Sequence, residues 1–175
     1  AEADVSIRKG WFFHPGEDST VKSGATLFNL YLKSVGRGGN MLLNVPPNRA
    51  GLISSVDSAA LMNFKKIREE AFASNVLKGA NILTTKDFIE IHLANEVSLN
   101  TLVLKEKITW GQRVVRFEIT GGNDLKKFDP IVSGTTIGHK RILQFPTQKL
   151  KYLRIQFTQY KAIPIMGDTE GYLAP

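Results

Sequence analysis

The sequence predicts a mixed fold in which a β/α half precedes an all-β half. The apolar period is helical from Ser23 to about Phe72, and it becomes two from Phe88 onward. In the first half two strand-like segments alternate with two helices, as they do in a β/α barrel or a doubly wound sheet. In the second half turn signals separate short alternating segments, which is the pattern of an antiparallel β-sandwich.

The first expected element is a strand near residues 2–8, where Val5 and Ile7 alternate with polar neighbours. It runs directly into the turn formed by residues 10–14, which is dense in aromatic and ionisable groups. In α/β sheets, ligand-binding groups lie where strands end and loops begin. Because neither an initiator Met nor an apolar leader precedes this strand, we expect the chain to begin inside a larger catalytic domain.

A short helix is expected next, ending at the glycine-rich residues 36–39. Its apolar side chains fall on one face, namely Leu27, Leu30, Tyr31 and Val35. Residues 40–45 then form a strand that Pro46 and Pro47 stop, since proline cannot donate to a ladder. The run is almost continuously apolar, so we expect a strand buried on both faces, as in a parallel sheet.

A second helix is expected to begin at Ser54 or Ser55, where Ser54 and Asp57 have the spacing of a capping box. Its predicted buried stripe consists of Val56, Ala60, Phe64, Ile67 and Ala71. A complete β/α barrel needs about 250 residues. This half of the chain therefore cannot close a barrel by itself.

The all-β half shows period-two alternation around residues 89–93, 115–119 and 153–157. Glycine, proline and asparagine clusters separate these segments. Five or six short antiparallel strands with one buried face correspond to a sandwich of about 100 residues. We therefore expect residues 1–75 to form the β/α segment and residues 76–175 to form the sandwich.

Composition excludes several classes of protein. The hydrophobic content of 42 % is that of a globular chain, and no apolar run is long enough to span a membrane. The net charge of +7 is spread along the chain rather than clustered. The three His residues lack ligand spacing and Cys is absent. We expect no metal, no nucleic-acid partner and no membrane partner.

Three motifs, in order, resemble the α-L-fucosidases of glycoside hydrolase family 29. Residues 2–14 are similar to the stretch Glu-(Ala/Cys)-Asp-Val-Ser-Ile-Arg-Pro-Gly-Trp-Phe of the branch acting on 1,3- and 1,4-linked fucose, with Lys9 replacing the proline. Residues 34–47 match a second motif almost unchanged. Residues 111–114 with 133–142 resemble a third, and the resemblance covers essentially the whole chain.

The resemblance implies that residues 1–75 are the C-terminal part of a (β/α)8-type barrel, followed by a galactose-binding or discoidin-like sandwich. It implies a retaining exo-α-L-fucosidase that removes terminal α-1,3/1,4-linked fucose from glycans without a cofactor. The partners would be a fucosylated oligosaccharide or glycoconjugate and the rest of the barrel. In the family the nucleophile is an Asp on an earlier strand, and the acid/base Glu also lies upstream of residue 1. The chain alone is therefore expected to be inactive.

Five residues are candidates for substrate binding, while the catalytic residues stay unknown. Glu2 is a barrel-mouth candidate and only a weak candidate for catalysis; it or Asp4 could instead anchor Arg8. Arg8 could donate to sugar hydroxyls or hold the nucleophile ionised, or it could serve as a structural ion-pair partner.

The other candidates follow in the turn and on the second strand. Trp11 could stack on the fucose ring or pack in the core. His14 could donate to a hydroxyl or anchor the loop, and Asn44 could orient the pocket floor or fix the loop backbone. In the sandwich, Trp110 and His139 could line a sugar-binding edge; core packing for the Trp and a surface turn for the His are the alternatives.

A rival function is a non-catalytic carbohydrate-binding or interaction module. Binding of a glycan without turnover by the complete protein would favour it. A periplasmic or secreted location is expected from the resemblance, because such an enzyme meets external glycans. Linkage preference and oligomeric state are not predicted from these residues.

Overall fold

The computed structural model describes the whole chain, residues 1–175, and it divides into two compact units. The N-terminal unit comprises Ala1–Ala71 and the C-terminal unit comprises Phe72–Pro175. All long α-helices belong to the first unit and all antiparallel strands to the second. None of the helices is both long and apolar enough to cross a membrane.

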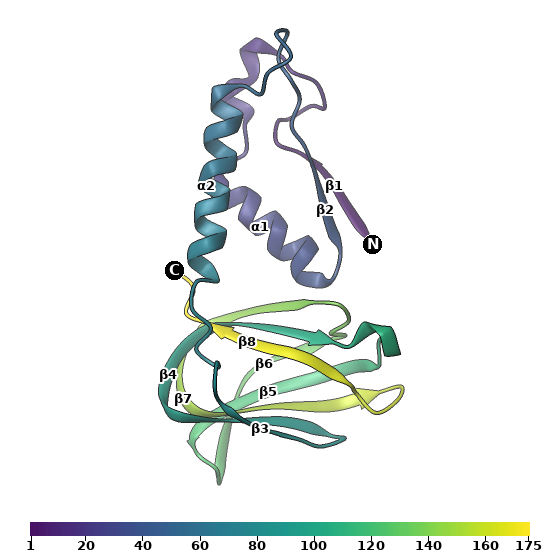
Figure 1. Ribbon diagram of the computed structural model, residues 1–175, viewed down its shortest axis with the longest axis vertical. Helices are drawn as coiled ribbons and strands as arrows, with labels where there is room; N and C mark the ends of the chain where they lie inside the picture. The colour runs from purple at the N-terminus through teal and green to yellow at the C-terminus, as the bar shows by residue number, and fades with distance from the viewer. The chain divides into compact units, whose positions relative to one another are not determined.

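The N-terminal unit contains two parallel strands and two helices. Strand β1 (Glu2–Ser6) pairs with β2 (Asn40–Asn44) in parallel, so that Ser6 lies opposite Asn44. Helix α1 (Gly24–Ser34) connects the two strands, and α2 (Ser55–Ala71) follows β2. Figure 1 shows both helices on the same side of the strand pair. The predicted order of strand, helix, strand and helix is confirmed.

Local signals explain where α1 begins and ends. The Ser23 hydroxyl accepts a hydrogen bond from the Thr26 amide (3.2 Å), which satisfies one of the unpaired amides of the first turn. A Cβ on Gly24 would lie 2.6 Å from the Phe64 amide nitrogen, so only glycine lets the two helices approach this closely. A short 3-10 turn, η2 (Val35–Arg37), follows the helix, and Gly38 ends it with a left-handed φ of 83°.

Two expectations for this unit are wrong. Residues of β2 are not buried on both faces, since the Leu42 side chain is 53 % exposed; β2 has β1 as its single strand neighbour and no second layer covers that face. On α2, Val56 is exposed whereas Asp57 is fully buried. The inward face of the helix therefore begins with a carboxylate that pairs with Arg8, as described below.

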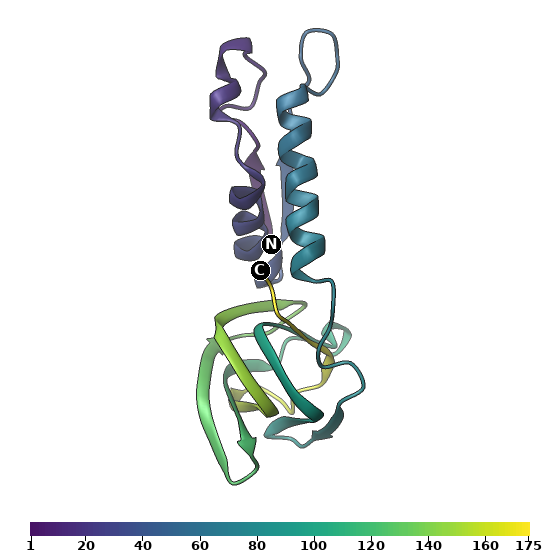
Figure 2. The ribbon, with the colours of Figure 1, turned by 90° about the vertical axis from the view of Figure 1, so that its left-hand side faces the viewer.

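The C-terminal unit is a six-stranded antiparallel structure. Its strands are β3 (Asn81–Thr84), β4 (Phe88–Glu106), β5 (Val114–Asp124), β6 (Lys127–Thr135), β7 (Arg141–Tyr160) and β8 (Met166–Tyr172), with a 3-10 turn η3 (Ile108–Trp110). The hydrogen-bonded order is β3-β4-β7-β5-β6, and β8 also pairs with β4. Figure 2 shows these strands curling around a common interior.

Two very long strands let one hydrogen-bonded sheet form both layers of the sandwich. The first half of β4 pairs with β3 and its second half pairs with β8. Between these halves the β4–β7 register shifts at residues 92–97 and 99–101, and such bulges bend a strand. The sandwich-like arrangement is therefore as predicted, but the expectation of uniformly short strands is wrong.

The core of this unit lies between the layers. It is made by the alternating residues that the sequence pattern predicts, including Ile89, Ile91, Phe117, Ile119, Leu153 and Ile155, all at most 3 % exposed. Truncating one such side chain to alanine costs about 2–5 kcal/mol. The C-terminal unit therefore has one contiguous hydrophobic core of its own.

Candidate functional site

The candidate site of the N-terminal unit lies where β1 and β2 end. Because the strands are parallel, their carboxyl ends meet at one edge, the position at which α/β sheets carry ligand-binding loops. The Ile7 amide donates to the Asn44 carbonyl (3.0 Å), which continues the ladder into the loop. The chain then enters residues 8–14 and a 3-10 turn, η1 (Pro15–Thr20).

Arg8 forms a buried ionic network at the base of this loop. Its Nε donates to Asp57 Oδ2 (3.0 Å), and both side chains are fully buried. Its Nη2 donates to Asp18 Oδ1 (2.9 Å) and to the Ser54 hydroxyl (3.0 Å). The guanidinium also lies over the Phe13 ring, 4.8 Å from its centre. Arg8 thereby ties the loop to η1 and to the start of α2.

The electrostatics of this network keep Arg8 charged. Burial by itself would lower the pKa of the guanidinium, but the hydrogen bonds that it donates to Asp57 and Asp18 outweigh burial and raise the pKa above its ordinary value. Two buried atoms, Arg8 Nη1 and Asp57 Oδ1, have no hydrogen-bond partner. The network therefore retains one donor and one acceptor that a bound water could satisfy.

Asn44 fixes the backbone of the aromatic turn. Its Nδ2 donates to the Trp11 carbonyl (3.0 Å) and to the Ser6 hydroxyl (3.1 Å), and that hydroxyl in turn donates to the Gly10 carbonyl (2.7 Å). Of the two roles considered for Asn44, the contacts correspond to fixing the loop. Two successive carbonyls of the turn, those of Gly10 and Trp11, are therefore fixed by hydrogen bonds from side chains of β1 and β2.

The side chains presented by this turn are exposed and aromatic. Trp11 is 51 % exposed and its neighbour Phe12 is 77 % exposed, so the indole of Trp11 is not part of a core. His14 lies just before η1 and is exposed; its carbonyl accepts from the Glu17 amide (3.1 Å). An indole face held on a fixed backbone is suited to stacking on the apolar face of a sugar ring.

Glu2 and Asp4 are both exposed on β1. Side chains two residues apart on a strand point to the same side, so the two carboxylates share one face of the strand pair. Neither of them contacts Arg8, whose carboxylate partners are Asp57 and Asp18. The suggestion that Glu2 or Asp4 anchors Arg8 is therefore wrong.

The structure brings the predicted residues Arg8, Trp11 and Asn44 together around one loop. A direct contact between Arg8 and a ligand is not supported, because the side chain is completely buried. The sequence interpretation missed Asp57, which it took for a helix cap. The backbone amide of Asp57 does donate to the Ser54 hydroxyl (3.2 Å), so Ser54 caps the helix as expected. Its helical spacing with Ala60, Phe64 and Ala71 was the signal that the carboxylate faces inward.

In the C-terminal unit, the alternative of core packing for Trp110 is wrong. Trp110 is 65 % exposed on η3, and His139 lies in an exposed turn. The buried carboxylate of Glu90 binds His92 (2.6 Å) and Arg154. Burial opposes its ionisation, but these hydrogen bonds outweigh that effect and lower the pKa of Glu90. This ion cluster fixes β4 against β7.

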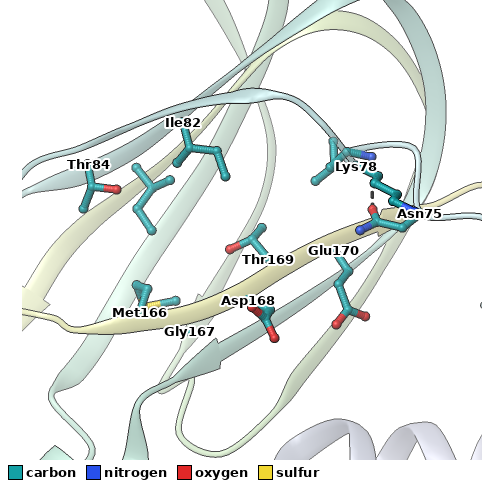
Figure 3. A pocket seen from close by; sticks show the side chains of 11 residues that line it. Asn75, Lys78, Ile82, Thr84, Met166, Gly167, Asp168, Thr169 and Glu170 are labelled. Carbon is teal, nitrogen blue, oxygen red and sulfur yellow. Dashed lines mark hydrogen bonds between the residues drawn. The ribbon is translucent and has the colours of Figure 1, made fainter.

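A hollow of about 430 Å³ lies between β3 and β8. Figure 3 shows Ile82, Met166 and Thr169 pointing into it, whereas Asp168 and Glu170 point away. Glu170 is instead bound to Lys105 (2.7 Å) and to the Tyr172 hydroxyl (2.7 Å). Because convergent polar groups are what orient a small ligand, and both carboxylates of this lining point away from the hollow, it is a weaker candidate than the loop around Trp11.

Comparison with known proteins finds similarity along the whole chain. Residues 1–66 match the family model described as Alpha-L-fucosidase. A rice protein (Oryza sativa subsp. japonica) provisionally named α-L-fucosidase 1 is 34 % identical across 95 % of the chain and 38 % of its own length. Alpha-L-fucosidase 1 of Arabidopsis thaliana is 33 % identical across 83 % of the chain and 35 % of its own length.

A solved structure gives the same picture for the fold. A glycoside hydrolase 29 family member from an unknown rumen bacterium superimposes with a TM-score of 0.89 at 35 % identity. The match covers 97 % of the chain and 32 % of the other protein. The chain thus spans little more than a third of the curated relatives that it matches.

Proposed function

The chain belongs to the α-L-fucosidases of glycoside hydrolase family 29, as part of their C-terminal portion, and from that premise we propose how its two units act. Residues 1–75 form the last part of a (β/α)8-type catalytic barrel, and residues 76–175 form a galactose-binding-type accessory sandwich. The parallel β1–β2 pair with both helices on one side supports this assignment. The uncovered Leu42 on the other face is consistent with further barrel segments lying there.

The proposed activity is that of a retaining exo-α-L-fucosidase acting on terminal α-1,3- or α-1,4-linked fucose. Retention requires two carboxyl groups about 5 Å apart that flank the scissile bond, one as nucleophile and one as acid/base. Glu2 and Asp4 project from the same face of one strand, whereas the two catalytic carboxyl groups must flank the scissile bond from opposite sides. We assign both catalytic carboxylates to the rest of the barrel, so the 175 residues alone turn over no substrate.

The proposed role in fucose binding rests mainly on the position of Trp11. Its indole is half exposed at the carboxyl edge of the parallel strands, and its carbonyl is held by Asn44. In this proposal Trp11 stacks on the apolar face of fucose, and His14 donates to or accepts from its hydroxyls. Glu2 lies at the opposite, amino end of β1, beside Asn40, and takes no part in this contact. Arg8 and Asn44 position the loop from behind rather than touch the sugar. The fucosylated substrate would be a free oligosaccharide or a glycoconjugate outside the cell, which corresponds to a periplasmic or secreted enzyme.

Kinetics of the enzyme that contains this chain together with the rest of the barrel test the role of Trp11. Trp11→Ala should lower kcat/KM for an aryl α-L-fucoside at least about tenfold, the effect of losing one aromatic contact of about 1.4 kcal/mol. Phe12→Ala removes the neighbouring, more exposed aromatic ring and should change kcat/KM less than about twofold. Equal losses in the two variants would contradict the assignment.

The rival function gives a different result in the same experiment. A non-catalytic module would bind fucosylated oligosaccharides while releasing no fucose, even with the complete barrel present. Comparing 1,3- and 1,4-linked trisaccharides with a 1,2-linked one tests the linkage preference separately. Cell fractionation of the source organism tests the location, with recovery in the cytoplasm as the contradicting outcome.

A further inference from the structure

Three loops converge at one end of the C-terminal sandwich. They comprise residues 107–113, 136–140 and 161–165, and they are called the loop cluster here. The Lys107 amide donates to the Ile165 carbonyl (2.8 Å), and the Lys161 amide donates to the Arg113 carbonyl (2.8 Å). The Glu106 amide donates to the Gly138 carbonyl (2.8 Å), which attaches the middle loop.

A buried carboxylate makes this loop cluster rigid. Glu106 is 4 % exposed and accepts from three amides: those of Arg113 (2.8 Å), Val114 (3.1 Å) and Gly138 (2.7 Å). The guanidinium of Arg113 then donates to the Trp110 carbonyl (3.2 Å) through Nε and to the Ile163 carbonyl (2.8 Å) through Nη1. The backbone that carries the exposed side chains is therefore fixed before any ligand arrives.

The loop cluster presents large apolar side chains to solvent. Ile108 is 44 %, Trp110 65 % and Ile163 57 % exposed. None of the three belongs to the hydrophobic core of the C-terminal unit. Exposed polar side chains belong to the same loop cluster, namely Thr109, Gln112 and His139. A flat indole surrounded by hydrogen-bonding groups is the composition of a surface that stacks on sugar rings.

The charge of the loop cluster has one sign. Its three segments contain Lys107, Arg113, Lys140 and Lys161 and no Asp or Glu. Glu106 is buried beneath them, and Glu170 interacts with Lys140. Lys107 and Lys161 are exposed, and no ion pair engages either of them. The two lysines flank the exposed apolar side chains, so an anionic ligand would be attracted to the same place as the sugar-stacking surface.

We propose that the loop cluster binds an anionic glycan, a saccharide that carries carboxylate or sulfate groups. Trp110 stacks on one of its rings, while Lys107 and Lys161 pair with its acidic groups. Arg113 acts as a positioning residue because its guanidinium is bonded to two loop carbonyls. This binding site is separate from the fucosidase proposal, and it does not depend on it.

An anionic lipid bilayer is the main alternative ligand, because it also combines negative charge with apolar groups. The polar side chains of the loop cluster favour a glycan instead. Insertion into a bilayer would remove water from Thr109, Gln112 and His139, which are exposed in the same loop cluster. An unpaired polar group in an apolar medium costs free energy, whereas sugar hydroxyls provide partners for all three. Vesicles of anionic lipid nevertheless belong in the test.

The test uses the full 175-residue chain and three polymers of defined chemistry. Polygalacturonate carries carboxylates, dextran sulfate carries sulfates and dextran is neutral. Binding is measured by affinity electrophoresis and by fluorescence at about 0.15 M salt, where the Debye length is about 8 Å. We expect at least one anionic polymer to bind about tenfold or more tightly than dextran, and binding should weaken as salt rises.

Variants distinguish specific binding at the loop cluster from non-specific attraction of an anionic polymer to a basic protein. Trp110→Ala should weaken binding about tenfold, and the double variant Lys107→Gln/Lys161→Gln should weaken it about five- to tenfold. The matched control is the β5–β6 turn, where Leu125 is 46 % exposed beside Lys126 and Lys127. Leu125→Ala and Lys126→Gln/Lys127→Gln should change the affinity less than about twofold.

Three results would overturn the proposal. Equal weakening in the control variants would show that binding follows net charge alone. Binding to dextran as tight as to the anionic polymers would exclude the role of the lysines. Binding to vesicles of anionic phospholipid that Trp110→Ala abolishes, with none to either anionic polymer, would assign the loop cluster to a membrane surface instead. Circular dichroism of each variant verifies that the sandwich stays folded.

Discussion

Replacing Asp57 by asparagine should destabilise the N-terminal unit far more than replacing Asp18 in the same way. Both carboxylates bind Arg8 at nearly the same distance, 3.0 Å for Asp57 and 2.9 Å for Asp18. They differ in burial, because the Asp57 side chain is fully buried and the Asp18 side chain is half exposed. The comparison therefore isolates the effect of burial on one guanidinium.

The magnitude follows from the contacts. Breaking a buried ion pair by removing one partner costs about 3–5 kcal/mol; we expect about 3 kcal/mol for Asp57→Asn, because Asp18 still neutralises Arg8. A half-exposed pair is worth less than about 1 kcal/mol, which sets the expectation for Asp18→Asn. A unit of this size has a total stability of about 4–10 kcal/mol, so Asp57→Asn leaves it marginally folded.

Urea unfolding followed by circular dichroism at 222 nm measures the free energy of unfolding of the N-terminal unit, because both α-helices belong to that unit. With a slope of about 1–2 kcal/mol per M, the midpoint should fall by about 1.5–3 M for Asp57→Asn and by less than about 1 M for Asp18→Asn. The double variant Arg8→Met/Asp57→Leu should recover most of the loss, since an apolar pair leaves no buried charge. Equal losses of stability for both carboxylates, or no recovery in the double variant, would show that burial does not set the difference between the two ion pairs.

Three further predictions concern packing, pH and the loop. Gly24→Ala should lower the stability of the N-terminal unit by about 1–3 kcal/mol, because its Cβ would meet the backbone of α2; Gly16→Ala, which has open space, should stay within about 0.5 kcal/mol in the same urea experiment. Glu90→Gln should cost about 1.5–3 kcal/mol at pH 7. Since the folded pKa of Glu90 is lowered, this gap should persist down to its ordinary value of 4.5 and close as pH falls further, as measured by unfolding at several pH values; a gap that widens in acid would contradict it. Asn44→Ala should raise the exchange rate of the amides in residues 10–13, measured by hydrogen exchange, and unchanged rates would exclude its role in holding the turn.

The periodicity of the sequence was sufficient for the elements with one buried face. Ile89, Ile91 and Phe117 are core residues because alternation forces them to the same side. It was insufficient where one strand serves two layers. No local signal shows that β4 continues from Phe88 to Glu106, since the partner strand changes along its length and only tertiary pairing determines this.

The candidate site shows the same division. Trp11 and Asn44 were identified from their position at the ends of strands, and that position is set locally. The partners of Arg8 were misassigned because Asp57 is 49 residues away in sequence and contacts Arg8 only after α2 packs beside the strands. For Trp110 the sequence left a sugar-binding edge and core packing open, and core packing is excluded because the rigid loop cluster beneath it carries the ring outward.

The decisive measurement for fucosidase activity is the release of fucose from a 1,3- or 1,4-fucosylated oligosaccharide. The assay follows the anomeric proton of the released sugar by NMR, for the 175-residue chain and for the enzyme that contains it together with the rest of the barrel. We expect no release of fucose by the chain alone, and α-L-fucose as the first product of the complete enzyme. Turnover by the chain alone, or binding without any release by the complete enzyme, would contradict it.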